Sequence, residues 1–353
     1  MKSKKFLVMG NWVLVVVLVV GILAIGCAPK PAPTPAGGGH EAYEVRAYTA
    51  PVGTSAYCLY VALEDICDKY HPWIKFSAIE GAGGTANAHA LIAADTEEKK
   101  HLVMLLNPPD YLRASQGLPP FESEQTDDLR FLHALTLVSG TMLTLDPNIK
   151  SIEDLEGKKV ALGKPTQSFW GTTAAELLEY GFGLKDGENI TIEWVGDSAG
   201  GTAMKDGLVD AAFMGGYGRE VYAARDPLLE LASTVKNVHY LDATEDACQK
   251  AAVNNPVFPL LIPAGTLPGN QPDDIYMIAM SVTFFVDKSF PDEVAYELVK
   301  LMMDHYQEFG DYHAIGKTFT SPSFAYYAPW IEDVDKVMHP GALNAFREAG
   351  MKS

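Results

Sequence analysis

Residues 151–217 read SIEDLEGKKVALGKPTQSFWGTTAAELLEYGFGLKDGENITIEWVGDSAGGTAMKDGLVDAAFMGGY, and this stretch decides the expected fold. The stretch Lys158–Leu162, which follows a short acidic turn, predicts a strand. The hydroxyl-rich loop after it leads into an Ala/Glu/Leu run that predicts a helix. A second strand is expected at 190–194, followed by a glycine-rich helix start at 198–202. Two successive strand-to-helix units predict a parallel α/β sheet whose loops gather at one edge.

The rest of the chain extends this pattern to two lobes. Roughly 310 residues remain after the N-terminal region, which is more than one hydrophobic core usually serves. The apolar run at 131–145 predicts a long strand that crosses from the first lobe to the second, with Ser139–Gly140 near the hinge, and 238–241 is the expected return. Further strands are expected at 44–49, 74–79, 99–106 and 275–286, and helices at 57–70 and 291–309.

The first residues have the layout of a secretory signal. Three lysines precede an apolar run from Trp12 to Gly26, and the small residue Gly26 stands directly before Cys27. This pattern predicts a lipoprotein signal peptide at 1–26 with lipidation of Cys27, and the alternative is an uncleaved anchor helix. Four prolines and a triple glycine follow, so residues 27–42 are expected to form an extended tether. Either alternative places the body of the protein outside the cytoplasmic membrane.

Composition and motifs exclude several classes of function. The 353-residue chain has 27 basic and 45 acidic residues and a net charge of −18, which makes nucleic acid and anionic membrane surfaces poor partners. The sequence has no metal-ligand spacing and no nucleotide-binding or hydrolase motif, so neither a metal, a cofactor nor an enzymatic activity is predicted. The three cysteines after Cys27 are expected to be free, although a bridge from Cys248 remains open.

Several motifs resemble one known family. These are DLEGKKVALG at 154–163, MKDGLVDAAF at 204–213, IPAGTLPGNQPDD at 262–274 and HPGALNAFREAG at 339–350. From about Glu44 onward the chain resembles the solute-binding subunits of TRAP transporters of the TAXI type. HPGALNAFREAG is the most specific part of the resemblance, and it favours a receptor over a catalytic role for its histidine.

The resemblance implies a periplasmic-binding-protein type II fold with a ligand cleft between two lobes, each a mainly parallel sheet flanked by helices. Lobe 1 is expected at 43–137 and 242–353, and lobe 2 at 138–241. The implied function is an extracytoplasmic receptor, expected to be a monomer, that binds a dicarboxylate, an oxoacid or an acidic amino acid and delivers it to integral membrane permease subunits. The alternative partner is an ATP-driven importer or a sensor system, and the alternative class is an enzyme on the same frame.

The candidate ligand residues lie in the loops that follow the predicted strands. Hydroxyls and backbone N–H groups at helix starts suit a carboxylate, and Arg219 could bind it with a planar guanidinium or instead pair with Glu220. Helix capping is the alternative for Thr85 and Asn87, and core packing is the alternative for Trp170 and Tyr217. The full predicted set is Thr54, Ser55, Tyr57, Gly84, Thr85, Asn87, Asn107, Ser168, Trp170, Thr172, Tyr217 and Arg219.

Overall fold

The computed structural model describes residues 40–351 apart from 53 and 254. The predicted signal peptide, Cys27 and nearly all of the predicted tether therefore lie outside the described residues. The strands are β1 (Tyr43–Tyr48), β2 (Ile74–Ile79), β3 (Leu102–Leu105), β4 (Leu129–Thr144), β5 (Lys159–Leu162), β6 (Thr191–Trp194), β7 (Ala211–Tyr217), β8 (Ala223–Ala224), β9 (His239–Tyr240), β10 (Phe258–Ile262) and β11 (Ile275–Asp287).

Helices flank these strands on both sides. They are α1 (Ser55–Tyr70), α2 (Gly84–Ala93), α3 (Thr96–Lys99), α4 (Pro108–Gln116), α5 (Ala174–Glu176), α6 (Gly200–Lys205), α7 (Asp226–Thr234), α8 (Glu245–Ala252), α9 (Asp292–Asp304), α10 (Phe309–Tyr312), α11 (Val334–Val337) and α12 (Pro340–Glu348). Residues Phe169–Thr173 and Leu177–Gly181 form π-helical turns on either side of α5.

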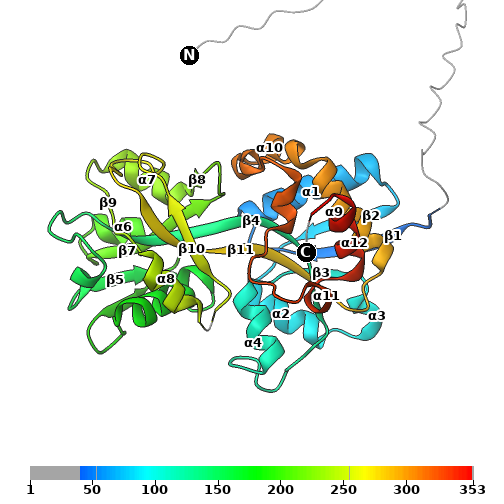
Figure 1. Ribbon diagram of the computed structural model, residues 1–353, viewed down its shortest axis with the longest axis horizontal. Coiled ribbons are helices and arrows are strands. Elements are labelled where there is room, and N and C mark those ends of the chain that lie inside the picture. Colours follow the sequence, from blue (N-terminus) through cyan, green and yellow to red (C-terminus); the bar gives the residue numbers. More distant parts are fainter. Residues whose placement is uncertain (1–39, 53, 254, 352–353) are drawn as a thin grey trace, which may run out of the picture. The chain divides into compact units, whose positions relative to one another are not determined.

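One mixed sheet carries both halves of the fold, in the order β2-β1-β3-β11-β4-β7-β5-β6. The strands β1, β2 and β3 are parallel, and so are β5, β6 and β7. Between these two wings, the long strands β4 and β11 run antiparallel to each other, and Figure 1 shows them spanning both halves. The predicted α/β class with two mainly parallel wings is confirmed.

Separate hydrophobic cores define two lobes. Leu135 of β4 and Phe284 of β11 belong to the first core, whereas Val138 and Met280 belong to the second. The register of β11 against β4 shifts at Val282/Thr283 and again at Phe284/Phe285, next to the point where the strands change core. Bulges of this kind bend a strand, so the crossing of β11 is locally irregular.

The expected return to lobe 1 at residue 242 is corrected by the packing. Ala243, Cys248 and Val257 lie in the same core as Leu177 and Leu178, and β10 pairs with the first half of β11. The residues at 238–241 give only the short strand β9, which pairs with the end of β4. The chain therefore remains in the second lobe through β10 and returns along β11. We call the part around β1–β3 the first lobe and the part around β5–β10 the second lobe.

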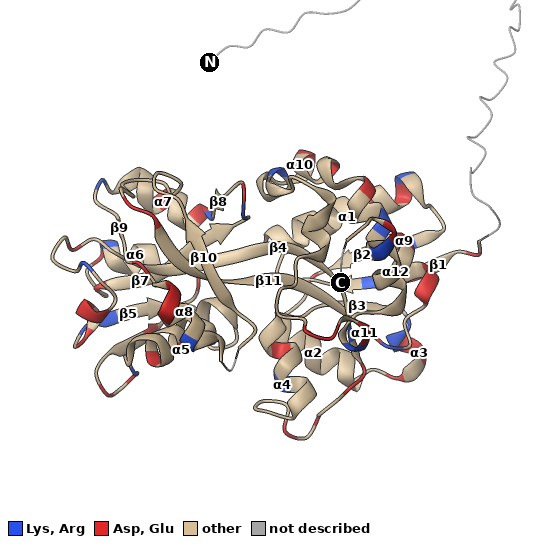
Figure 2. Ribbon diagram, viewed as in Figure 1, with Lys and Arg blue, Asp and Glu red and all other residues tan. Residues whose placement is uncertain are grey.

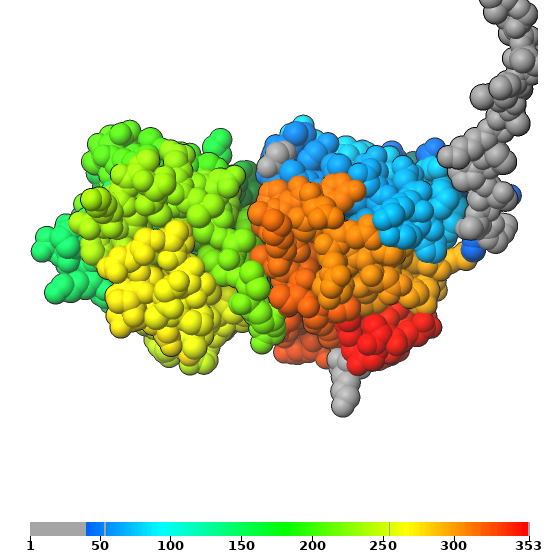
Figure 3. All heavy atoms as spheres, turned by 90° about the horizontal axis from the view of Figure 1, so that it is seen from above, coloured from blue at the N-terminus to red at the C-terminus, as the bar shows by residue number. Residues whose placement is uncertain are grey.

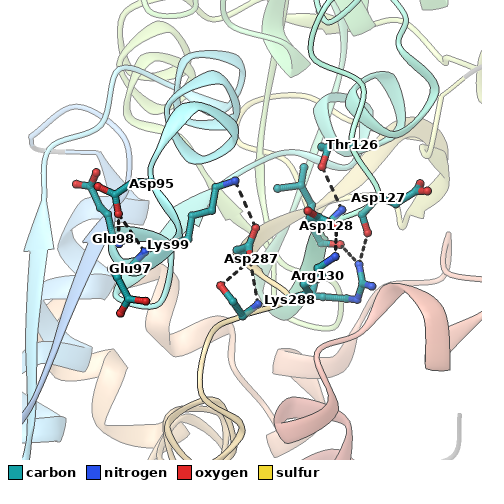
Figure 4. A network of polar contacts seen from close by, with 12 residues as sticks. Asp95, Glu97, Glu98, Lys99, Thr126, Asp127, Asp128, Arg130, Asp287 and Lys288 are labelled. Carbon is teal, nitrogen blue, oxygen red and sulfur yellow. Dashed lines mark hydrogen bonds and ion pairs between the residues drawn. The ribbon is translucent and has the colours of Figure 1, made fainter.

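Charged residues near the outer ends of β4 and β11 have structural partners. Lys99 Nζ lies 3.7 Å from Asp287 Oδ2, and the side chain of Lys99 points toward Asp287 in Figure 4. Lys288 pairs with Asp128 at 2.7 Å, and the guanidinium of Arg130 donates to the carbonyl oxygen of Asp127. This network fixes the ends of the two long strands far from the lobe crossing.

The cysteines among the described residues are free thiols, as expected. Cys67 and Cys248 are buried and Cys58 is half-buried. Burial raises the pKa of the Cys67 thiol well above its ordinary value and that of Cys248 to about 12. These two side chains are therefore protonated at neutral pH and are poor nucleophiles.

His133 on β4 is neutral and fully enclosed in the first core. Its Nδ1–H donates to the carbonyl oxygen of Ala134 at 2.9 Å, which leaves Nε2 to accept from the Tyr60 hydroxyl at 2.7 Å. Burial lowers the pKa of His133 to about 4, whereas an unfolded histidine titrates near 6.5. Between about pH 6.5 and 4, His133 is protonated in the unfolded chain but stays neutral in the folded chain.

We therefore expect the free energy of unfolding to decrease as the pH is lowered from about 6.5 to about 4. His133 should contribute up to about 1.4 kcal/mol per pH unit to this decrease. Urea unfolding at several pH values measures this slope, and His133→Gln should make it shallower in that window. An unchanged slope in the variant would show that His133 does not carry this proton linkage.

Candidate functional site

The carboxyl ends of both parallel wings meet where the lobes touch. In the first lobe the loops after β1, β2 and β3 lie at one sheet edge, and in the second lobe the loops after β5, β6 and β7 do so. The amide nitrogen of Asn107, which follows β3, donates to the hydroxyl of Ser168, which follows β5, at 2.6 Å. Ligands of open α/β sheets bind at such edges, so this junction is the candidate site.

In the first lobe, Asp110 organises the loops around α2 and α4. Its carboxylate accepts from the Thr85 hydroxyl at 2.7 Å and from the backbone N–H of Asn107 at 3.2 Å. A side chain at Gly84 would collide with Asp110 Oδ2, so only glycine allows the start of α2 to lie this close. Burial raises the pKa of Asp110 despite these donors. The predicted ligand residue Thr85 thus uses its hydroxyl proton within the protein.

Asn87 is buried and has a structural role. Its Nδ2 lies 3.3, 2.9 and 3.1 Å from the carbonyl oxygens of Tyr48, Thr49 and Leu105, so it links α2 to the ends of β1 and β3. A buried carbonyl group that loses its donor is left without a hydrogen-bond partner. The expectation that this amide donates to a ligand is therefore corrected.

We expect Asn87→Ala to lower the free energy of unfolding by about 2 kcal/mol, because buried acceptors are left unsatisfied. Equilibrium urea unfolding measures the change. Wild-type stability combined with reduced ligand affinity would show instead that Asn87 contacts the ligand.

The loop after β1 places its predicted residues around the start of α1. Thr54 is the N-cap, and its hydroxyl accepts from the backbone N–H of Tyr57 at 3.4 Å. Ser55 and Tyr57 are half-buried in the first turn of α1. Thr54 is therefore a capping residue, while the side chains of Ser55 and Tyr57 stay candidates.

In the second lobe, the loop after β5 closes tightly on itself. The Thr172 hydroxyl donates to the carbonyl oxygen of Ser168 at 3.0 Å, which leaves its lone pairs as acceptors. A side chain at Gly171 would collide with the carbonyl oxygen of Lys164, so this turn requires glycine. Trp170 is buried and packs edge-on against Phe213. Ser168 and Thr172 thus lie at the junction, but their hydroxyls already have partners.

Arg219 contacts an aromatic ring and is not paired with Glu220. Its guanidinium carbon lies 4.9 Å from the centroid of the Tyr327 ring, and Glu220 accepts from the Thr320 hydroxyl at 2.8 Å. Both partners belong to the first lobe, so this loop forms a second bridge between the lobes. In Figure 3 the green residues of the second lobe abut the orange residues of the first. Tyr217 packs against both main cores.

A half-buried arginine that the sequence pattern did not single out lies beside Trp170. The guanidinium carbon of Arg225 is 4.3 Å from the Trp170 ring centroid, and Nη2 lies 2.6 Å from Asp197 Oδ2. Gln167 Nε2 donates to the other oxygen of Asp197 at 2.8 Å. Burial alone would raise the pKa of Asp197, but Arg225 and these hydrogen bonds outweigh it and lower the pKa. Arg225 directly precedes the acidic helix start Asp226-Pro227, and this position is the sequence feature that could have indicated it.

A second missed group joins the lobes directly. Arg113 Nη2 of α4 lies 2.8 Å from Glu176 Oε1 of α5, and Asn255 Nδ2 donates to the other oxygen of Glu176. About a fifth of each charged side chain is exposed. Burial raises the pKa of Glu176, although Arg113 and Asn255 partly oppose the shift. The sequence signal was a glutamate on the apolar side of the run AAELLEYG. We call Arg113, Glu176 and Asn255 the interlobe cluster.

Two hollows lie outside this junction. One of about 200 Å³ is lined by residues including Lys150, His239 and Asn270 in the second lobe, and another of about 550 Å³ lies along Tyr326–Met338 in the first. Within residues 40–351, leaving aside 53 and 254, no cluster of three or more acidic, histidine or cysteine side chains could hold a metal ion. Over the same residues, none of the helices is both long enough and apolar enough to cross a membrane.

One protein-family model matches most of the chain. A model described as "NMT1-like family" matches residues 48–350. Among solved structures, the chain is similar to a TctC solute-binding protein from Polaromonas, with a TM-score of 0.47 and 14% identity over 78% of this chain and 86% of that one. It is also similar to a putative periplasmic sulfonate-binding protein from Methylobacillus flagellatus, with a TM-score of 0.49 and 13% identity over 89% and 96%.

A further similar structure is MatC from Rhodopseudomonas palustris with bound malate, with a TM-score of 0.47 and 12% identity over 87% of this chain and 96% of that one. All three TM-scores are below 0.5. The ligands of these proteins are therefore not transferred to this chain.

Proposed function

The chain belongs to the NMT1-like family, and from this premise we propose that it is an extracytoplasmic solute receptor whose two lobes close on a small organic acid. The observation that carries the proposal is the junction itself. Strand-end loops of two separate parallel wings meet there, and Asn107 bonds to Ser168 across the lobes. Two lobes joined by a few crossing segments can open and close by a hinge motion.

The proposed ligand contacts come from both sides of this junction. From the first lobe we propose Ser55, Tyr57 and the backbone N–H groups at the start of α2, whose N-cap Gly83 has no capping side chain. From the second lobe we propose Ser168, Thr172, Tyr217 and, in place of Arg219, the guanidinium of Arg225. Trp170 holds that guanidinium by stacking, and a planar fork matches a carboxylate bidentately. In the closed form Ser168 accepts from Asn107, and the hydroxyl proton of Ser168 stays available to a ligand carboxylate.

We propose TRAP-type membrane permease subunits as the partners, on the motifs that resemble the TAXI type, and a lipid anchor on Cys27. The second candidate is the binding lipoprotein of an ATP-driven importer or a sensor. A multi-helix permease encoded beside this chain supports the first candidate, and an ATPase subunit supports the second. Mass spectrometry of the N-terminal peptide tests the anchor, and an unmodified Cys27 would contradict it.

A thermal-shift panel of dicarboxylates, oxoacids and acidic amino acids tests the receptor function. A ligand at 100 times its dissociation constant adds about 2.7 kcal/mol to the free energy of unfolding, so at least one acid should raise Tm by several degrees. Neutral amides of the same acids are the matched controls and should shift Tm much less. A panel in which no acid raises Tm more than its amide would contradict the proposal.

A conservative pair of substitutions tests the assignment of Arg225. Arg225→Lys keeps the charge beside Asp197 but loses the fork, so we expect the Kd of the acid to rise about tenfold. Arg219→Lys is the control and should change Kd less than threefold, because Arg219 contacts Tyr327 instead. Isothermal titration calorimetry measures both. A larger loss in the Arg219 variant would reverse the assignment.

A further inference from the structure

The first lobe has an open groove outside the proposed solute site. It has a volume of about 550 Å³ and is lined by the segment from Tyr326 to Met338, which enters and includes α11. Its apolar floor contains Ile331 and Met338, and two adjacent tyrosines form one wall. All of its lining residues belong to the first lobe. The groove therefore serves no contact in the proposed capture of the solute.

The rim of this groove is acidic. Glu332, Asp333 and Asp335 line it, and none of the described lining residues is basic. Asp335 pairs with Arg347 at 2.8 Å, while Asp333 caps α11 by accepting from the backbone N–H of Lys336. Within the part of the chain that the structure describes, Glu332 and Asp333 have no ion-pair partner. In Figure 2 the chain that enters α11 carries red, acidic segments.

The aromatic wall of the groove depends on both lobes. The carbonyl oxygen of Tyr327 accepts from the Ser281 hydroxyl of β11 at 2.6 Å. Its ring packs against second-lobe residues: Phe258 has its ring centroid 5.8 Å away, and Arg219 has its guanidinium carbon 4.9 Å away. Opening the lobes would remove these ring contacts. The shape of the groove is therefore coupled to closure.

We propose that this groove docks a cationic, apolar-flanked segment of a membrane partner when the lobes are closed. Lysine or arginine heads of such a segment would meet Glu332, Asp333 and the tyrosine faces, and the aliphatic stems would lie on the apolar floor. A partner that binds only the closed-state shape of this groove distinguishes the closed receptor from the open one. The inference rests on the proposed function only for the identity of the partner as a membrane subunit.

The probe is an acetylated and amidated Lys-Leu-Arg-Leu-Lys pentapeptide. It is titrated onto the full chain in a saturating amount of the acid that gives the largest thermal shift, which keeps the lobes closed, and binding is followed by microscale thermophoresis. Glu332→Gln with Asp333→Asn should weaken its binding about tenfold, since two unpaired charges are removed while asparagine still caps α11. The matched control is Glu122→Gln with Asp127→Asn, an equal change of charge on exposed residues elsewhere in the first lobe. Its affinity should stay within twofold of wild type.

Equal losses in the two double variants would show bulk attraction to an acidic protein and would overturn the proposal. Spermidine binding as tightly as the peptide, with the same loss in the groove variant, would identify a small-cation site instead. Because each comparison is made between variants at the same saturating acid concentration, neither result bears on the receptor function.

Arg219→Gln tests the coupling to closure by the sign of its effect. Electrostatics alone predicts tighter binding of the cationic peptide, because a positive charge near the groove is removed. The proposal predicts binding weaker by about threefold, because the Tyr327 ring loses one of its two second-lobe contacts and keeps only Phe258. Tighter binding by this variant would overturn the requirement for the closed state.

Discussion

Replacing Arg113 with methionine is expected to weaken binding of the cognate acid about 100-fold, which corresponds to about 3 kcal/mol. Arg113 Nη2 lies 2.8 Å from Glu176 Oε1 across the lobe junction, where only about a fifth of each side chain is exposed. In the variant, closing the lobes would bury the Glu176 carboxylate with Asn255 as its remaining partner. The substitution therefore makes the free energy of lobe closure less favourable, whereas the Tm of the ligand-free protein should barely change. Calorimetric titration with the acid measures the loss.

The double variant Arg113→Met with Glu176→Met is the control. Replacing both charges of a buried pair by apolar side chains is often close to neutral, so affinity should return to within about tenfold of wild type. If the double variant binds as weakly as Arg113→Met, the loss has another origin, and the interlobe cluster does not control closure.

His339→Ala is expected to lower the free energy of unfolding by about 4 kcal/mol. The side chain is fully buried, Nδ1 accepts from the backbone N–H of Gly341 at 3.3 Å, and Nε2–H donates to the carbonyl oxygen of Phe290 at 2.8 Å. The substitution leaves a cavity, removes the N-cap of α12 and orphans a buried carbonyl group. Equilibrium urea unfolding measures the effect.

His339→Asn keeps a capping side chain and should recover part of that loss. Both variants should bind the acid as tightly as wild type while folded, since His339 lies in the first-lobe core. A catalytic or ligand-binding histidine would instead reduce function without reducing stability, and that outcome would contradict this account.

The sequence predicted local structure and the sheet class well. The run at 131–145 lacks polar alternation because β4 is buried on both faces, and this identified the long crossing strand correctly. The motif HPG also has a clear physical basis: His339 caps α12, Pro340 starts it, and Gly341 permits close approach to the backbone of Asp292 in α9. In these segments local pattern and tertiary packing agree.

Pairings between distant residues could not be predicted. Asn107 and Ser168 are 61 residues apart, and Arg113 and Glu176 are 63 apart, so nothing in the local pattern associates them. The prediction that residues 242–262 belong to the first lobe was wrong. An apolar run does not specify which of two hydrophobic cores it joins. Thr54, Thr85 and Asn87 occupy loop positions that suit either a ligand contact or an internal bond, and in the structure their polar groups make internal bonds.

The most direct test of closure on an organic acid is small-angle X-ray scattering with and without the acid that gives the largest thermal shift. The account predicts that the ligand-free protein is more open, and that saturating acid lowers the radius of gyration to that of the closed arrangement with Asn107 on Ser168 and Arg113 on Glu176. A scattering profile that stays the same at saturating acid would contradict a receptor that closes its lobes on the ligand.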